Sequence, residues 1–386
     1  MEWWFHLPLA LWSLWVFLFG LGVGSFLNVV VARLPYEKSL IWPSSRCFVC
    51  FRKIRLTDNL PILGYFRLRG RCRHCAAPYS PRYLILEVAT GLAFLGLFWL
   101  EIVTQASFGP DFLKPWFHAP GLMFPYLDYN NPIPHWRCWV HFVIHSLLLL
   151  GLLAAALIDA KHKIIPLQIT YLGTAFGLLT NAIFPWPWPN GLADIAKLPV
   201  GTTWMELPLN VPIPNGLAMW PFWGPWPSWA PPGSMAMGLL TGLIGAGVGL
   251  LIGRGIKALF EVGLGKEALG LGDADLLMMA GSFLGWQAIS LALPIGAVIT
   301  LVAVVPMFLW AKIRGRRFDP ALPFGPGIAA GVVACWLGWP WLGELVRAAY
   351  FDLLVMAILG GIVGGGLLLF GFLLRRPPEP STAKSS

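Results

Sequence analysis

The chain has 386 residues, of which 57% are hydrophobic and only 12% are charged. An ordinary soluble domain carries about 25% charged residues, so the composition excludes a single soluble globular enzyme. The mean hydropathy of +0.69 agrees with this. We therefore expect a polytopic membrane protein in which the net charge of +9 reports mainly on topology.

Apolar runs of the length needed to cross a bilayer, roughly 20 residues, recur along the whole chain. They predict an all-α fold with eight to nine transmembrane helices. The runs lie near 7–31, 83–104, 139–160, 165–185, 235–256, 274–291, 293–311, 323–340 and 351–374. Between 274 and 311, only Gln287, Ser290 and Pro294 suggest a turn, and we place a helix boundary there. Gly245, Gly249 and Gly253 have the four-residue spacing of closely packed membrane helices.

The positions of Lys and Arg indicate the orientation of the helices. If the N-terminus lies outside, 23 of the 27 cations fall in loops on one side, and only Lys114, Arg137, Lys197 and Arg347 fall on the other. The cation-rich segments are 32–82, 161–165, 254–273, 312–322 and the tail from 375. Such a bias marks the cytoplasmic side. We expect a multi-pass protein of the inner (cytoplasmic) membrane, with the lipid bilayer as a partner and no nucleic acid.

Two aspartates lie where an apolar run meets a basic loop. Asp159 ends the run 139–160, and Asp273 precedes the run 274–291, so the topology brings both to the cytoplasmic membrane face. An ordinary helix-end charge would explain Asp273, but it explains Asp159 poorly because a helix C-terminus disfavours an anion. An acid at the edge of the hydrocarbon is costly and therefore marks a candidate functional site.

A pair of neighbouring carboxylates can hydrolyse a peptide bond without a metal. One stays protonated and polarises the carbonyl, while the other is ionised and activates water. We predict Asp159 and Asp273 as this pair, with Gly270 and Gly272 letting a substrate backbone come close. The alternatives are a transporter or channel that uses the acids as a proton relay and a non-catalytic assembly scaffold. A transporter would tend to place its acids near the middle of the membrane.

Four cysteines in the first basic loop form two C-x-x-C motifs separated by 21 residues: Cys47, Cys50, Cys72 and Cys75. This spacing predicts a four-thiolate zinc site of zinc-ribbon type. A reducing cytoplasm disfavours disulfides there, and the metal would supply folding energy to a loop with little core. His74 could replace one thiolate, although a solvated loop histidine is the simpler interpretation. The loop's arginines lack the interleaved aromatics of a nucleic-acid surface.

Taken together, the motifs resemble those of the type IV prepilin leader peptidases, which are bifunctional membrane enzymes of the GxGD aspartic class. The resemblance covers roughly residues 20–335. Besides the cysteine motifs and Asp159, it rests on Gly24-Ser25-Phe26-Leu27-Asn28, Asp58-Asn59-Leu60-Pro61, Ser80-Pro81-Arg82-Tyr83 with Glu87, Ile164-Ile165-Pro166, Gly270-Leu271-Gly272-Asp273 and Pro323-Phe324-Gly325-Pro326.

The resemblance implies catalysis by Asp159 and Asp273 and zinc at the four cysteines. It also implies that the substrates are type IV prepilins or pilin-like (pseudopilin) secretion proteins, from which a short basic leader is removed. Members of the family often methylate the new N-terminus from S-adenosylmethionine. The remaining alternative within this context is a non-catalytic scaffold of the pilus or secretion machinery.

Three features depart from the family pattern. Asp275 stands where a Lys is usual, residues 186–234 form a long outer loop rich in Trp and Pro, and the run 351–374 exceeds the usual eight helices. The outer loop is expected at the membrane interface, as aromatic belts are. We divide the chain into a first transmembrane helix (1–31), a cytoplasmic zinc-binding loop domain (32–82), a peptidase membrane domain (83–350) and an extra C-terminal helix with a tail (351–386).

Overall fold

The computed structural model describes residues 3–103, 135–184, 229–230, 234–264, 270–315, 323–350 and 353–374. Most of the outer loop 186–234 therefore lies outside the described residues, together with its expected interfacial position. Within the described part, the chain folds almost entirely into helices. The strand-like pairings there are two isolated bridges, Arg46–Lys53 and Arg71–Pro78. The predicted all-α class is confirmed.

The helices follow one another along the chain with short connections. Their bounds are α1 Trp3–Arg33, η1 Leu34–Tyr36, η2 Leu56–Asp58, α2 Leu63–Arg67, α3 Arg82–Phe98, the π-helical turn η3 Trp99–Val103, α5 His135–His162, α6 Leu167–Ile183, α8 Met235–Leu264, α9 Leu271–Leu284, α10 Trp286–Ile313, α11 Gly325–Tyr350 and α12 Leu353–Leu374. Every apolar run predicted from the sequence overlaps one of these helices.

Within the described ranges, five helical segments are long and apolar enough to cross a membrane. They are Leu9–Tyr36, Arg82–Val103, Trp139–His162, Met235–Gly263 and Trp286–Ile313, and Gly325–Trp339 and Leu354–Leu369 are shorter apolar segments. Helix α9 has 14 residues, or about 21 Å at 1.5 Å per residue, which is shorter than a hydrocarbon core of about 30 Å. Helix α9 therefore ends inside the bundle.

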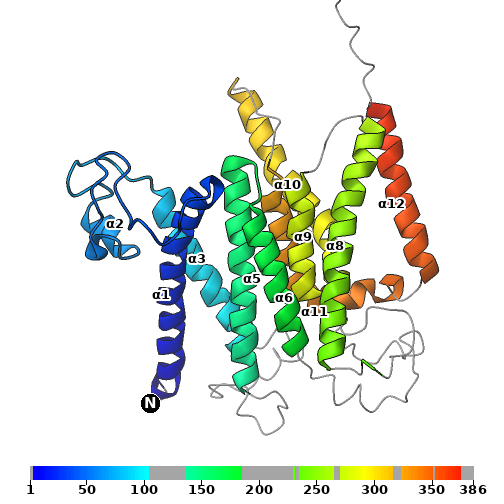
Figure 1. Cartoon of the computed structure of the whole chain (residues 1–386), viewed down its shortest axis with the longest axis horizontal. Helices are drawn as coiled ribbons and strands as arrows, with labels where there is room; N and C mark the ends of the chain where they lie inside the picture. Colours follow the sequence, from blue (N-terminus) through cyan, green and yellow to red (C-terminus); the bar gives the residue numbers. More distant parts are fainter. Residues whose placement is uncertain are drawn as a thin grey trace, which may run out of the picture.

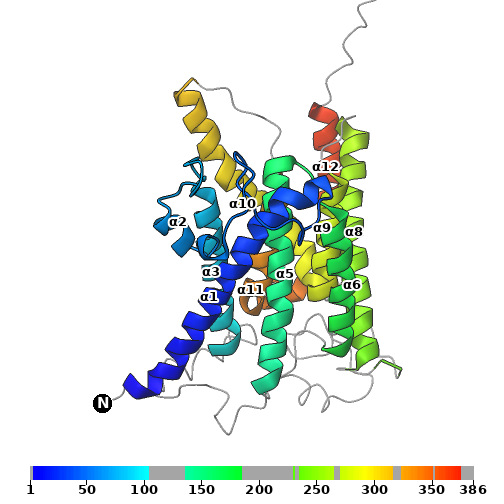
Figure 2. The same ribbon diagram turned by 60° about the vertical axis from the view of Figure 1, so that its left-hand side comes forward.

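The helices run alternately up and down, and their connections gather at two ends (Figure 1). The N-terminus lies at the lower end in Figure 1. The segment 34–81, the α5–α6 connection and the C-terminal ends of α8, α10 and α12 lie at the upper end, and Figure 2 shows the same separation. We call this upper end the basic end, because the cation-rich segments of the sequence adjoin it. The alternation agrees with the predicted topology.

The boundary between α9 and α10 differs from the prediction. The break falls at Gly285, which has φ 80° and ψ 173° and separates Leu284 from Trp286. A positive φ at this residue favours glycine. Gln287, Ser290 and Pro294, which we expected at the turn, lie inside α10. Two helices, α9 and α10, still lie between residues 270 and 315, as predicted.

Helices α8 and α9 pack through the glycines that the sequence singled out. A Cβ added to Gly253 would lie 2.6 Å from Cα of Ala274, and one at Gly249 would meet the backbone of Leu277. Gly245 packs in the same way on Gly281. The predicted small-residue contact is confirmed, and it draws α9 tightly against α8.

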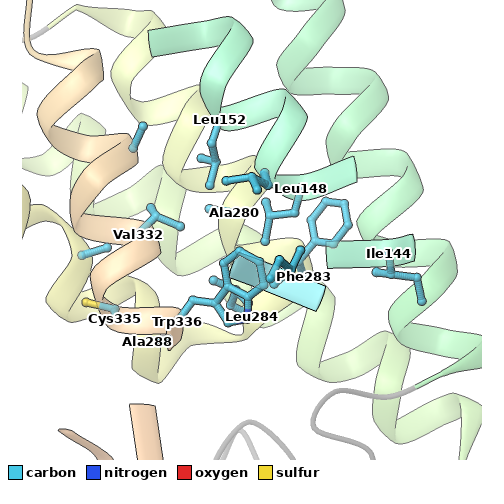
Figure 3. Close-up of a cluster of buried hydrophobic side chains, with 14 of the residues drawn as sticks. Ile144, Leu148, Leu152, Ala280, Phe283, Leu284, Ala288, Val332, Cys335 and Trp336 are labelled. Carbon is cyan, nitrogen blue, oxygen red and sulfur yellow. The ribbon is translucent and has the colours of Figure 1, made fainter. Parts of the chain in front are cut away.

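Helix α9 lies at the centre of the hydrophobic core. Figure 3 shows Leu148 and Leu152 of α5 and Trp336 of α11 gathered around Phe283 and Leu284 of α9, and all five side chains are buried. Such close packing leaves little freedom for a helix to shift. The residues that follow Asp273 in the first turns of α9 are buried as well, so the core also fixes the N-terminal end of this helix.

Candidate active site and metal centre

Asp159 lies in the last turn of α5 and is 7% exposed. Its Oδ2 accepts a hydrogen bond of 2.8 Å from the backbone N–H of Gly325, the first residue of α11. The first N–H groups of a helix have no partner within the helix, and the helix dipole favours an anion there. The N-terminus of α11 thus compensates the unfavourable position of Asp159 at the C-terminal end of α5.

Asp273 occupies the first turn of α9 and is also 7% exposed. Its Oδ2 accepts a hydrogen bond of 3.1 Å from the N–H of Gly270, which caps the helix. The carboxylates of Asp159 and Asp273 are close enough to interact electrostatically. The structure therefore brings the two predicted residues together at the basic end, each held by a backbone N–H at a helix N-terminus.

The glycines beside the two carboxylates make room for neighbouring atoms of the chain itself. A Cβ on Gly325 would lie 2.8 Å from Oδ2 of Asp159, and a Cβ on Gly272 would lie 2.8 Å from Cβ of Ile165. Gly272 therefore lets the segment that follows α5 pack against α9. A Cβ on Gly270 would meet only Oδ2 of Asp273, at 3.4 Å, and the role of Gly270 and Gly272 in the approach of a substrate backbone stays a prediction.

Asp275 is buried two residues beyond Asp273, with 4% exposure. Its Oδ1 lies 4.0 Å from Nη2 of Arg254 in α8, and the Arg254 side chain is half exposed. A cation from a different helix thus lies near the position where the family usually carries a Lys. Arg254 thus places a positive charge beside Asp275.

The sequence motifs include Gly325, but they do not predict the hydrogen bond from its N–H to Asp159. The two residues are separated by 166 positions, so no local pattern connects them. The available signal was Pro326, because proline is favoured at the first position of a helix and marks its N-terminus. A helix N-terminus at the basic end is a suitable partner for a carboxylate at that end.

The four predicted cysteines form one cluster. Their sulfur atoms all lie within 4.8 Å of one another, with 3.7 Å between Cys47 and Cys75 and 3.9 Å between Cys50 and Cys72. Four thiolates bound tetrahedrally at a Zn–S distance of about 2.3 Å would be separated by about 3.8 Å. The cluster therefore has the ligand type, number and spacing of a structural zinc site. His74 lies outside it and contacts Arg52 at 3.3 Å.

The two C-x-x-C motifs have the same local fold. In the first, the N–H of Phe51 donates to the carbonyl of Cys47 and the N–H of Cys47 donates to Arg52. In the second, Ala76 donates to Cys72 and Cys72 donates to the carbonyl of residue 77. Phe51 and Ala76 both have a positive φ, 56° and 55°. Two equivalent knuckles thus face each other and present four sulfurs to one point.

The electrostatics of the cluster suit a cation. Hydrogen bonds from the backbone N–H groups of Cys75 and His74 lower the pKa of Cys72 to about 6. The pKa of Cys75 is raised to about 11, because burial and the neighbouring sulfurs outweigh the hydrogen bond from the backbone of residue 77. Four thiolates this close repel one another, and a bound divalent cation would remove that repulsion.

Comparisons with known proteins agree with these features. The model of the bacterial peptidase A24 N-terminal domain matches residues 18–100. Curated relatives named "Prepilin leader peptidase/N-methyltransferase" include those of Pseudomonas putida, 28% identical over 87% of this chain and 92% of the relative, and of Burkholderia pseudomallei (strain 1026b), 30% identical over 85% and 86%. That of Myxococcus xanthus (strain DK1622) is 28% identical over 84% of this chain and 72% of the relative. No solved structure matches the chain.

The family model covers the segment that contains the four cysteines, and the three relatives each match between 84% and 87% of this chain. The chain is a member of the prepilin leader peptidase/N-methyltransferase family of enzymes.

Proposed function

We propose that the protein is a membrane aspartic endopeptidase that removes the basic leader from type IV prepilins or pseudopilins at the cytoplasmic membrane face. Asp159 and Asp273 carry out the cleavage as a GxGD-type pair. The protein then methylates the new N-terminus, since the names of its relatives contain both activities. It resides in the inner membrane as a multi-pass protein.

The meeting of two buried carboxylates, Asp159 and Asp273, at one end of the bundle is the observation that carries the proposal. The ionised carboxylate takes a proton from water as the oxygen of that water attacks the scissile carbonyl. The protonated carboxyl polarises the same carbonyl, and the leaving amine receives a proton as the C–N bond breaks. The pair requires no metal, and the cysteine cluster belongs to a separate part of the chain.

The charge distribution supports cleavage at the cytoplasmic face. The cation-rich segments adjoin the end of the bundle that contains Asp159 and Asp273, and such segments face the cytoplasm. A prepilin whose apolar helix remains in the bilayer would present its scissile bond at that depth. Because these segments are basic, long-range attraction cannot recruit a basic leader, so the shared membrane must bring the two proteins together.

The cysteine cluster fits a structural zinc ion. Cys47, Cys50, Cys72 and Cys75 would hold Zn²⁺ as four thiolates, which leaves no open coordination position for chemistry. The zinc would stabilise the segment 32–82, whose hydrophobic core is small. S-adenosylmethionine is the methyl donor in this proposal.

The proposal is tested by removing each ionisable group at nearly constant volume. Asp159→Asn and Asp273→Asn should each abolish leader removal from a prepilin in reconstituted membranes, while the protein accumulates and unfolds at the usual temperature. Glu261→Gln is the matched control, because Glu261 is a partly exposed carboxylate of α8 that contacts Lys257 of the same helix. Substantial cleavage by either aspartate variant would refute the catalytic pair.

A further inference from the structure

The short helix α2 presents two different faces. Gly64 and Tyr65 belong to the wall of a cavity of about 300 Å³ between the segment 34–81 and the helices α1 and α3. Leu63 and Phe66 lie one helical turn apart and therefore share a face, and they are 66% and 64% exposed. The side of α2 that faces away from the cavity is thus apolar.

The neighbouring turn η2 extends this exposed apolar surface. A Cβ on Gly64 would collide with the carbonyl of Asp58, so α2 and η2 pack together as one unit. Leu56 of η2 is 88% exposed, and Leu60 in the connection to α2 is 49% exposed. A group of large exposed apolar side chains on a folded segment marks an interaction surface. We call the following residues the apolar patch: Leu56, Leu60, Leu63 and Phe66.

The patch is held at the level of the membrane-spanning helices. The N–H of Ile62, within the same turn, donates a hydrogen bond of 2.9 Å to Oε2 of Glu87 in α3. Glu87 lies about 7–8 Å from the start of α3, inside the span Arg82–Val103. A Cβ on Gly24 of α1 would lie 2.8 Å from Cα of Glu87, and Gly24 lies about 13 Å from the C-terminal end of α1. Ile62 is therefore anchored closer to the membrane centre than the ends of both helices.

The segment that carries the patch lies beside the bundle. Figures 1 and 2 both show α2 to the side of α1 and α3, and lower than the upper end of α10. A surface in this position, next to the outermost spanning helices and level with their ends, meets the lipid that surrounds the bundle. A soluble protein partner would reach the top of the segment more easily than its side.

Cations accompany the patch. Arg55, Arg67 and Arg69 are exposed, and Arg55 and Arg67 lie near Asp58. The carboxylate of Asp58 already binds Arg73, with 2.8 Å between Oδ2 and Nε, so the charge around the patch is net positive. Apolar side chains flanked by Arg are typical of segments that lie in the membrane interface, where the guanidinium groups reach anionic headgroups and the apolar groups enter the acyl boundary.

We propose that the apolar patch inserts into the bilayer leaflet at the basic end of the bundle. The side chains of the patch contact acyl chains, and Arg55, Arg67 and Arg69 bind the phosphate groups of anionic lipids. The contact holds the segment 34–81, and with it the cysteine cluster, at a fixed height in the membrane. It is independent of the proposed peptidase activity, because neither aspartate takes part in it.

The test uses spin labels on the zinc-loaded, full-length protein, with one copy in each lipid nanodisc. A label is attached at Phe66→Cys, and Leu56→Cys carries the test if the first variant fails to bind zinc or to fold. Leu301→Cys is the lipid reference, because Leu301 is 61% exposed within the span Trp286–Ile313. Glu37→Cys is the water reference, because Glu37 directly follows the span Leu9–Tyr36 and is exposed.

Collisions with oxygen and with a neutral nickel chelate distinguish three environments of the label. A label in lipid is accessible to oxygen and protected from nickel, a label in water is accessible to nickel, and a label buried in protein is protected from both. In discs that contain phosphatidylglycerol, the label at Phe66 should lose nickel accessibility relative to Glu37 and match Leu301 in its preference for oxygen.

The contribution of the cations is tested in the same discs. Arg67→Gln, or a change to phosphatidylcholine alone, should shift the label at Phe66 toward the nickel accessibility of Glu37. Unchanged accessibility after both changes would overturn the role of anionic headgroups. Labels at Phe66 and Leu56 with the nickel accessibility of Glu37 would overturn the insertion itself. Protection of both labels from oxygen as well as nickel would also overturn it and would assign the patch to a protein contact.

Discussion

Gly325→Ala isolates the contribution of the helix N-terminus that holds Asp159. The added Cβ would lie 2.8 Å from Oδ2 of Asp159 and 3.1 Å from its Cβ and Cγ. The carboxylate or α11 must therefore move, and the hydrogen bond of 2.8 Å from the Gly325 N–H is lost or lengthened. A hydrogen bond to a charged group contributes about 1.5–3 kcal/mol, which corresponds to a roughly 10- to 150-fold fall in the rate of leader removal.

The assay is the initial rate of leader removal from a full-length prepilin, measured at equal amounts of folded enzyme. Gly338→Ala is the matched control in the same helix, since its Cβ would meet only the end of the Leu342 side chain at 3.3 Å. The control should cleave at the wild-type rate. A Gly325→Ala protein that accumulates normally and keeps the wild-type rate would refute the view that α11 positions Asp159.

Three further expectations follow from the same geometry. Purified protein should contain about one zinc ion per chain. Cys75→Ser should lower the zinc content and the unfolding temperature more than it lowers the rate of cleavage per folded molecule. Finding no bound metal in protein whose four thiols are reduced would contradict this. Asp275→Asn should lower cleavage far less than Asp273→Asn, because Asp275 is directed toward Arg254 of α8; equal losses in the two variants would place Asp275 in the pair. A prepilin with its apolar segment should be cut far better than the soluble leader peptide, with little dependence on salt, and equal turnover of the two would argue against recruitment through the membrane.

The parts of the fold that depend on local pattern could be predicted from the sequence. Apolar runs identified the helices because burial in a bilayer requires about 20 consecutive apolar residues. The spacing within Cys47–Cys50 and Cys72–Cys75 identified the cysteine cluster because each knuckle is a local turn. The glycines at 245, 249 and 253 identified the contact face of α8, because a four-residue spacing places small residues on one face of a helix.

The α9–α10 boundary was wrong because two signals competed. Pro294 suggested a break, yet neighbouring helices in a membrane can accommodate a proline inside a helix, and Pro294 lies within α10. Gly285 is the true boundary because it has a positive φ, which glycine adopts without strain. The choice between the two depends on tertiary packing, which a local pattern does not contain.

A buried contact between Glu101 and His145 within the bundle was also outside the reach of sequence patterns. Oε1 of Glu101, in the turn that ends α3, lies 2.5 Å from Nδ1 of His145 in α5, and both side chains are buried. The ring of Trp336 in α11 packs on His145 with 4.8 Å between ring centroids. Because a buried polar group needs a hydrogen-bond partner, Glu101 must have one, but that partner is 44 residues away along the chain.

The electrostatics of the aspartate pair follow from the three helix ends that meet there. The N-termini of α9 and α11 each contribute about half a positive charge, and the C-terminus of α5 contributes about half a negative charge. Their sum, about half a positive charge, can stabilise one carboxylate but not two. This balance is what the proposed mechanism requires, because one member of the pair must hold a proton while the other activates water. The convergence of α9 and α11 on Asp159 and Asp273 therefore supports a single shared negative charge as the resting state of the site.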